Sequence, residues 1–181
     1  MNGLIVYGSH YGATRRYAQE LSERTGLHAC PLAEVGDLSR SEALVYLGGM
    51  YAGGVLGLKQ AVKRLDGRAP RCLLIATVGL ADPSEGENAK NLRAAVARAL
   101  PEELLRRAKL YHLRGGIDYE KLTLPHRGMM RLAYERARRQ PEAARSAEDR
   151  AIIATYGKAV DMVDFAALEP LCAALWQEAM S

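Results

Sequence analysis

The sequence predicts an α/β fold in which a doubly wound, five-stranded parallel sheet is covered by helices on both faces. Short apolar runs alternate with segments of helical periodicity along most of the chain, as in repeated strand-helix units. The run at 72–79, CLLIATVG, is almost continuously apolar, which is typical of a central strand buried on both faces. A loop of small and hydroxyl residues at 8–14 separates the first apolar run from the first helix, where open α/β sheets bind ligands.

The periodicity predicts each strand and helix of the sheet. Strands are expected at 3–9, 27–32, 42–49, 71–79 and 108–116, and helices at 13–26, 58–65, 86–100 and 164–180. Gly26 is the expected end of the first helix, and Asp164 is the expected N-cap of the last. The core-facing residues at helical spacing are Ala13, Tyr17, Ala18 and Leu21; Leu58, Ala61, Val62 and Leu65; Ala89, Leu92, Val96 and Ala99; and Phe165, Leu168, Cys172, Leu175 and Ala179.

The stretch at about 117–158 interrupts this alternation, and we interpret it as an insertion within a single domain that spans 1–181. It contains no clear strand. Two helical pieces are predicted, at 126–139 and 146–157. The second begins with a capping box, Ser146 followed by Asp149, and ends at Gly157.

The composition is that of a globular domain, with 49% apolar and 25% charged residues. The apolar runs are too short to span a membrane, and the N-terminus lacks the basic segment of a signal peptide, so we expect a cytoplasmic protein. Cys30, Cys72 and Cys172 show neither C-x-x-C spacing nor a zinc pattern. We therefore expect reduced, buried thiols and no metal site.

Positive charge is concentrated in one part of the chain. The net charge is +4, yet nine basic residues stand against four acidic residues between positions 109 and 145. The basic residues are Lys109, Arg114, Lys121, Arg127, Arg131, Arg136, Arg138, Arg139 and Arg145. No nucleic-acid partner is expected, because this run has no recognised binding motif and its basic helix has a single tyrosine.

The loop GSHYGATRR after the first strand has the features of a phosphate site. A helix N-terminus offers unpaired backbone N–H groups and the positive end of the helix dipole. Ser9 and Thr14 add hydroxyl groups, and Gly12 allows the backbone to curve around an anion. The loop has neither the lysine of G-x-x-x-x-G-K-S/T nor the spacing of G-x-G-x-x-G, so a dinucleotide is disfavoured. The alternative is an ordinary strand-helix turn.

The spacing Ser9-x-x-Gly12-x-Thr14 resembles the flavodoxin phosphate loop, Thr/Ser-x-Thr-Gly-x-Thr, with Tyr11 in the place of the middle threonine. Two further loops, GGMYAGG at 48–54 and TVGLADPSEG at 77–86, resemble the loops on either side of the flavodoxin isoalloxazine. The resemblance implies bound FMN and the strand order 2-1-3-4-5. It also implies that Gly53 takes a positive φ where a peptide faces the flavin N5, and that Tyr51 stacks on the ring. The cofactor residues carried over are Ser9, His10, Tyr11, Gly12, Ala13, Thr14, Gly49, Met50, Tyr51, Ala52, Gly53, Thr77, Val78, Gly79 and Leu80. The alternatives are a flexible glycine loop with a core tyrosine, and a plain turn around Asp82 and Pro83.

The basic insertion after the fifth strand is similar in position and composition to the long insert of the menaquinone-dependent protoporphyrinogen dehydrogenase family. That resemblance implies an FMN oxidoreductase with protoporphyrinogen or a similar organic donor and a quinone acceptor. Arg114, Arg127 and Arg131 are then candidates to bind substrate carboxylates. His112 and His126 are candidates for assisting proton transfer, the alternative being structural histidines. No catalytic residue is identified.

Other interpretations of the chain stay open. One is a flavodoxin-type electron-transfer or flavin-sensing module without substrate turnover, and another is a scaffold that has lost FMN. The insertion is either a structural helix with a solvated basic face or a membrane-surface anchor, which would place the protein at the inner face of the membrane. The residues that suggest an anchor are Met129, Met130, Leu132, Ala133 and Tyr134 among Arg127, Arg131, Arg136, Arg138 and Arg139.

Overall fold

The computed structural model describes residues 2–180. Its main sheet has five parallel strands in the spatial order β2-β1-β3-β5-β6, which is 2-1-3-4-5 when they are numbered along the chain. These strands are β1 (Gly3–Gly8), β2 (His28–Pro31), β3 (Ala43–Tyr51), β5 (Cys72–Gly79) and β6 (Lys109–Arg114). The predicted fold class and strand order are therefore confirmed. A short antiparallel strand, β4 (Gly54–Val55), pairs with the end of β3.

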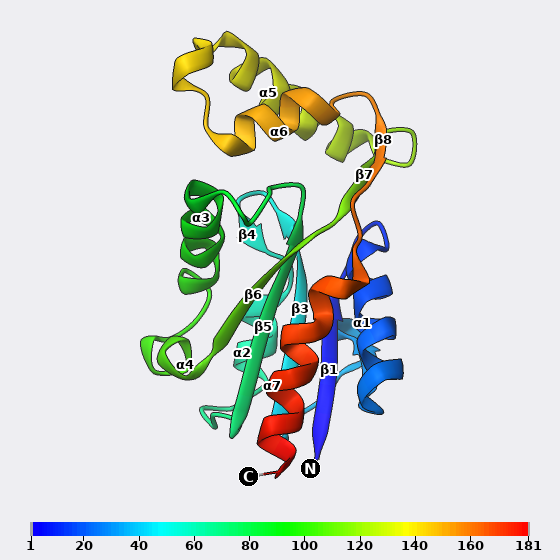
Figure 1. Cartoon of the computed structure of the whole chain (residues 1–181), viewed down its shortest axis with the longest axis vertical. Helices are drawn as coiled ribbons and strands as arrows, with labels where there is room; N and C mark the ends of the chain where they lie inside the picture. The colour runs from blue at the N-terminus through cyan, green and yellow to red at the C-terminus, as the bar shows by residue number, and fades with distance from the viewer. Residues whose placement is uncertain (1, 181) are drawn as a thin grey trace.

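Helices cover both faces of this sheet (Figure 1). The helices α1 (Ala13–Thr25) and α7 (Glu169–Met180) pack on one face, and α2 (Leu58–Lys63), α3 (Gly86–Ala97) and α4 (Glu102–Arg107) pack on the other. The central strand β5 serves both cores because its side chains alternate in direction. Leu74 and Ala76 face the first core, whereas Leu73 and Ile75 face the second. Burial on both faces explains the continuous apolar run of this strand.

The ends of the elements follow the expected local chemistry. Gly26 ends α1 in a left-handed conformation with φ of 72°, as predicted. Asp164 accepts a hydrogen bond from the backbone N–H of Ala166, which confirms the predicted cap. The turn that it caps is a 3-10 turn, η3 (Phe165–Leu168), and α7 begins only at Glu169. A shorter 3-10 turn, η1 (Leu32–Glu34), follows β2.

The insertion forms the end of the molecule opposite the two termini (Figure 1). It contains α5 (Leu124–Arg139), the 3-10 turn η2 (Glu142–Ala144) and α6 (Ala147–Thr155). The predicted capping box is present, since Ser146 and Asp149 each accept the other's backbone N–H. The two helices pack against each other, and the Tyr134 and Tyr156 rings stack with centroids 3.9 Å apart.

A two-stranded antiparallel ribbon connects the insertion to the sheet. It consists of β7 (Gly116–Asp118) and β8 (Ala159–Asp161), with Asp118 opposite Ala159. The expectation of no strand in the insertion was wrong at Ile117 and Asp118. A three-residue strand carries almost no periodic signal, and its partner lies some forty residues along the chain.

Three further expectations need correction. The sequence did not predict α4, which begins after Pro101, nor the hairpin strand β4. Ala179 is exposed rather than in the core. In α3, Asn88 and Ala95 are buried together with Leu92 and Val96, while Ala89 is only half-buried. Ala99 lies beyond the end of the helix and is also half-buried. The buried Asn88 amide is satisfied because its Nδ2 donates a hydrogen bond to the Asp82 carbonyl at 2.9 Å.

All three cysteines are free thiols. Cys72 and Cys172 are buried as expected, whereas Cys30 is half-buried. Burial raises the pKa of each thiol, which lowers its reactivity. Within residues 2–180, no helix is both long enough and apolar enough to cross a membrane.

Candidate functional site

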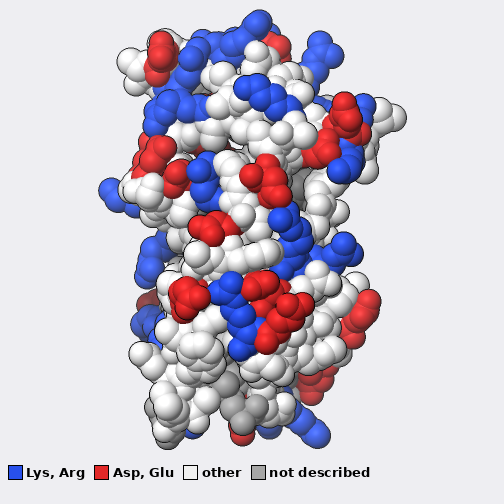
Figure 2. All heavy atoms as spheres, turned by 45° about the vertical axis from the view of Figure 1, so that its right-hand side comes forward, with Lys and Arg blue, Asp and Glu red and all other residues white. Residues whose placement is uncertain are grey.

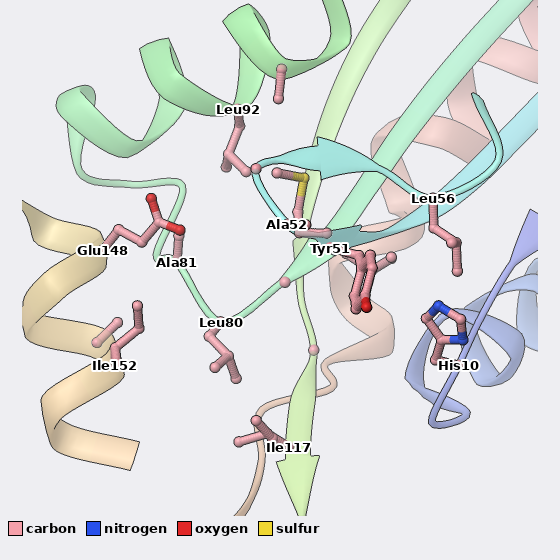
Figure 3. Close-up of a pocket in the computed structure, with 18 of the residues that line it drawn as sticks. His10, Tyr51, Ala52, Leu56, Leu80, Ala81, Leu92, Ile117, Glu148 and Ile152 are labelled. Carbon is pink, nitrogen blue, oxygen red and sulfur yellow. The ribbon is translucent and has the colours of Figure 1, made fainter. Parts of the chain in front are cut away.

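A cavity of about 570 Å³ lies where β1, β3 and β5 end and the insertion begins. Its lining comes from the loop after β1, the β3–β4 hairpin, the loop after β5, α3 and the insertion helices (Figure 3). It contains most of the predicted cofactor residues, namely Ser9, His10, Tyr11, Ala13, Thr14, Gly49, Met50, Tyr51, Ala52, Gly53, Val78, Gly79 and Leu80. The exceptions are Gly12 and Thr77. The crevice therefore forms at the carboxyl ends of the strands, as expected for this sheet class.

The loop after β1 presents unpaired donors to this cavity. Gly12 stands at the N-cap of α1 with φ of 97°, a conformation that favours glycine. The Ser9 hydroxyl accepts a hydrogen bond from the Gly12 N–H at 3.1 Å, which shapes the turn. Thr14 is only 3% exposed, and its hydroxyl has no hydrogen-bond partner among residues 2–180. The backbone N–H groups of residues 13–15 are also free within that range, as at any uncapped helix start.

The β3–β4 hairpin turns at Ala52 and Gly53, directly beside the cavity. Both residues have positive φ, 48° and 72°, which is the pattern of a two-residue type I′ turn. The predicted positive φ at Gly53 is confirmed. Alanine in such a conformation costs about 1–2 kcal/mol, so Ala52 is strained. Arg98 of α3 holds the turn by donating a hydrogen bond to the Gly53 carbonyl at 2.5 Å.

The loop after β5 brings Val78, Gly79 and Leu80 to the cavity but leaves Thr77 behind. Thr77 is buried and its hydroxyl bonds to Nδ1 of His112 at 2.8 Å. His112 does not line the cavity. Burial, and secondarily the charge of Arg93, lowers the pKa of His112. These contacts favour the structural interpretation of His112 over a proton-transfer role.

Four aromatic rings meet at one end of the cavity, beside the loop after β1: His10, Tyr11, Tyr51 and His126. The His126 centroid lies 5.2 Å from His10, 5.4 Å from Tyr11 and 5.0 Å from Tyr51. The Tyr11 hydroxyl also hydrogen-bonds to Nδ1 of His126 and accepts the backbone N–H of Thr123. The start of α5 is thus attached to the phosphate-type loop through Tyr11.

The part of the cavity between α3, the loop after β5 and the insertion helices, which we call the outer cavity, is mainly apolar. Figure 3 shows Glu148 and Ile152 of α6 projecting toward Leu80 and Ala81 of the loop after β5. The apolar side chains around this part are Leu80, Leu92, Ile117, Leu122, Met129, Met130 and Ile152. The polar groups are those of Asn88, Asn91, Arg98, Arg136 and Glu148.

The arginines that line the cavity differ from those expected to bind substrate. Arg114 pairs with Asp82 at 3.3 Å, Arg127 donates to the Glu120 carbonyl at 2.6 Å, and Arg131 is exposed. None of these three lines the cavity. Arg98 and Arg136 line it instead.

The sequence contains a pattern that marks the side of α3 facing the cavity, although the sequence analysis did not identify it. The residues Asn88, Asn91, Leu92, Ala95 and Arg98 recur at helical spacing, and all of them line the cavity. Two asparagines and an arginine on one face are unusual for a helix that packs only on a sheet. No comparable signal marks Arg136, because arginines occur on several sides of α5.

The histidine pair gives the site a measurable pH response. Burial, and secondarily the charge that His126 carries when protonated, lowers the pKa of His10 below its ordinary value of 6.5. Below pH 6.5, His10 binds a proton more readily in the unfolded chain than in the folded chain. We therefore expect the free energy of unfolding to fall as the pH drops below 6.5. Imidazole NMR should give a His10 midpoint below 6.5 that rises in His126→Gln. The His112 midpoint should not move in that variant, and a His10 midpoint at or above 6.5 would contradict the geometry.

Residues 4–143 match the family model of a flavodoxin domain. A cysteine variant of the flavodoxin from Pseudomonas aeruginosa is 24% identical, covers 73% of this chain and 93% of its own, and has a TM-score of 0.39. The flavodoxin, WrbA-like protein from Agrobacterium tumefaciens is 18% identical, with coverage of 60% and 81% and a TM-score of 0.39. No curated protein matches the chain.

Proposed function

This chain belongs to the flavodoxin domain family, and on that premise we propose that it is an oxidoreductase that binds FMN in the cavity. One observation carries the proposal. The Thr14 hydroxyl, on a side chain that lines the cavity, and the N–H groups of residues 13–15 lack partners within residues 2–180, at the helix end that faces the cavity. A phosphate monoester supplies the acceptor oxygens and the negative charge that these donors require. The chain offers no second phosphate loop for a dinucleotide such as FAD.

The loops beside the phosphate position fit a flat ring. The hydroxyl of Thr14 lies next to Gly49, where an added Cβ would be 3.3 Å from it, so the first loop and the hairpin loop adjoin. The hairpin and the loop after β5 adjoin each other, and both line the cavity. The position of His126 opposes direct entry of the flavin ring, because the ring centroids of Tyr51 and His126 lie only 5.0 Å apart. A ring stacked between them requires about 7 Å, twice an ordinary contact distance, so His126 must move aside.

The proposed chemistry divides between the cofactor and this chain. When bound, FMN supplies the hydride or single-electron chemistry. The apolar side chains around the outer cavity bind an organic donor and exclude water, and Arg136 offers a cation to a carboxylate. A flat, apolar donor with carboxylate groups, such as protoporphyrinogen, suits this lining, and a quinone suits it as the acceptor. The insertion is therefore proposed as the substrate-binding part.

The alternative function is a flavodoxin-type electron-transfer or flavin-sensing module without its own turnover. One observation favours it, which is that Arg114, Arg127 and Arg131 lie off the cavity. The two proposals differ in a direct assay. The oxidoreductase oxidises a porphyrinogen with a quinone in repeated turnovers, whereas the module exchanges electrons only with a redox protein or a small mediator.

The substitution Thr14→Val tests FMN binding. It removes a cavity-facing hydroxyl that has no partner within residues 2–180 and keeps the shape of the side chain, so the apoprotein should be about as stable as the parent. A hydrogen bond to a charged group contributes roughly 1.5–3 kcal/mol, so FMN affinity should fall about tenfold or more. Calorimetric titration and urea unfolding measure the two quantities. Unchanged affinity in Thr14→Val and in Ser9→Ala would place the phosphate elsewhere.

A further inference from the structure

The outward face of α5 carries two leucines that no part of the described chain covers. Leu124 is 81% exposed and Leu132 is 75% exposed. Leucines eight residues apart on a helix are separated by about 12 Å along its axis. The remaining residues of this face are Arg127, Gly128, Arg131, Glu135, Arg138 and Arg139, and we call the whole set, with the two leucines, the α5 outer face.

The charge of the molecule is concentrated on this helix. Five arginines and one glutamate give α5 a net charge of +4, which equals the net charge of the entire chain. The rest of the chain is therefore neutral overall. Figure 2 shows blue side chains gathered at the top of the molecule, the end formed by the insertion. The only acid on the outer face, Glu135, lies 3.7 Å from Arg138, so the other arginines keep an uncompensated charge.

The opposite face of α5 is already occupied, which fixes the direction of the outer face. Met129 and Met130 line the cavity, Ala137 is fully buried, and Tyr134 stacks on Tyr156, which directly follows α6. Of the residues that suggested an anchor, Met129, Met130, Ala133 and Tyr134 line the cavity or are half-buried, so they lie off this outer face. Of the expected apolar set, Leu132 alone is exposed, and Leu124 joins it.

We propose that the α5 outer face docks on an anionic lipid leaflet. In that position the two leucines enter the boundary between headgroups and acyl chains, while the arginines reach the phosphate groups. The face combines surplus positive charge with exposed aliphatic side chains. A nucleic acid would use the arginines but would gain little from the leucines, and an acidic protein would need an apolar patch shaped to cover both leucines, whereas an anionic leaflet offers both chemistries everywhere. The insertion lies at the end of the molecule away from both termini, so a flat surface can approach it (Figure 1).

This proposal goes beyond the proposed oxidoreductase function and uses no residue of the cavity. Docking is expected with or without FMN, so its failure and the failure of FMN binding are separate results. If both proposals hold, the cavity lies beside a membrane surface from which an apolar quinone can reach it.

Co-sedimentation of the full-length chain with vesicles tests the docking. We expect binding to phosphatidylcholine vesicles containing about one-third phosphatidylglycerol, no binding to pure phosphatidylcholine, and weaker binding as salt increases. Arg131→Gln with Arg139→Gln removes two charges that have no partner within residues 2–180. With about 1 kcal/mol for each surface charge, this variant should bind roughly thirtyfold more weakly. Leu124→Ser with Leu132→Ser should also weaken binding.

Matched controls show whether binding depends on this face in particular or on any loss of surface charge or of an exposed apolar side chain. Lys59→Gln with Lys90→Gln removes two exposed charges from α2 and α3, and Met180→Ser removes an apolar side chain that is 82% exposed. Both controls should bind like the parent. Unchanged circular dichroism in every variant confirms that the fold is intact. No binding to anionic vesicles would overturn the proposal, as would equal binding by the double-leucine variant. Tighter binding to polyglutamate or DNA than to vesicles would identify an acidic macromolecule and also reject the lipid.

Discussion

Replacing residues 119–158 by an Asn-Gly turn is expected to abolish oxidation of an organic donor while FMN still binds. Asp118 and Ala159 are paired across the β7–β8 ribbon, so a two-residue turn can close it. Neither of the two core clusters of the sheet contains a residue from 119–158. The shortened chain should therefore keep its sheet and its three cofactor loops.

Under the oxidoreductase proposal, donor oxidation depends on side chains that this replacement removes. The outer cavity loses Leu122, Met129, Met130, Arg136 and Ile152. Without them the donor is neither held nor shielded from water, and loss of such positioning lowers rates about a hundredfold or more. FMN affinity should stay within roughly threefold of the parent, because the phosphate-binding donors are intact and His126 no longer has to be displaced.

Anaerobic reduction of the FMN-loaded protein by porphyrinogen measures this loss. Reoxidation by ferricyanide is the control, since a small mediator needs no organic binding pocket and should act equally on both proteins. Donor oxidation at the parental rate in the shortened chain would show that the insertion has no part in turnover. The electron-transfer module would then be the better description, and the resemblance to the protoporphyrinogen dehydrogenases would be abandoned.

Gly8→Ala is expected to lower the free energy of unfolding by about 2–3 kcal/mol and to weaken FMN binding. Gly8 ends β1, directly before the phosphate-type loop. A Cβ there would lie 2.6 Å from the backbone oxygen of Leu56 and 3.0 Å from the Tyr46 hydroxyl. Those two groups hydrogen-bond to each other, so the added methyl group must displace the hairpin exit or break that bond. Either change shifts the hairpin relative to the first loop.

Gly3→Ala is the matched control for Gly8→Ala, because it places the same methyl group at the other end of the same strand. Its Cβ would lie 2.9 Å from Cδ2 of Leu27, the flexible end of a side chain that can rotate away. Urea unfolding and FMN titration of both variants measure the difference. Equal losses in the two variants would show that the close approach of Leu56 to Gly8 has no special role.

The sequence by itself determined the elements of the sheet and the position of the cavity. The apolar run of β5, the glycine after α1 and the Ser146–Asp149 capping box are encoded within a few residues of one another, so local patterns are enough to predict them. The cofactor loops were found because each follows directly on a strand, and parallel strands end at the same edge of a sheet.

The tertiary structure alone decided which side chains of the insertion meet that cavity. Arg136 lines it while Arg131 does not, and Met130 lines it while Leu132 is exposed, although all four lie on α5 within seven residues. Although this helix is amphipathic, its own periodicity does not show which of its faces meets the cavity. The face is selected by α6 and the β7–β8 ribbon, whose pairing joins residues some forty positions apart. The approach of His126 to Tyr11 depends on the same long-range packing, because it brings together side chains 115 residues apart.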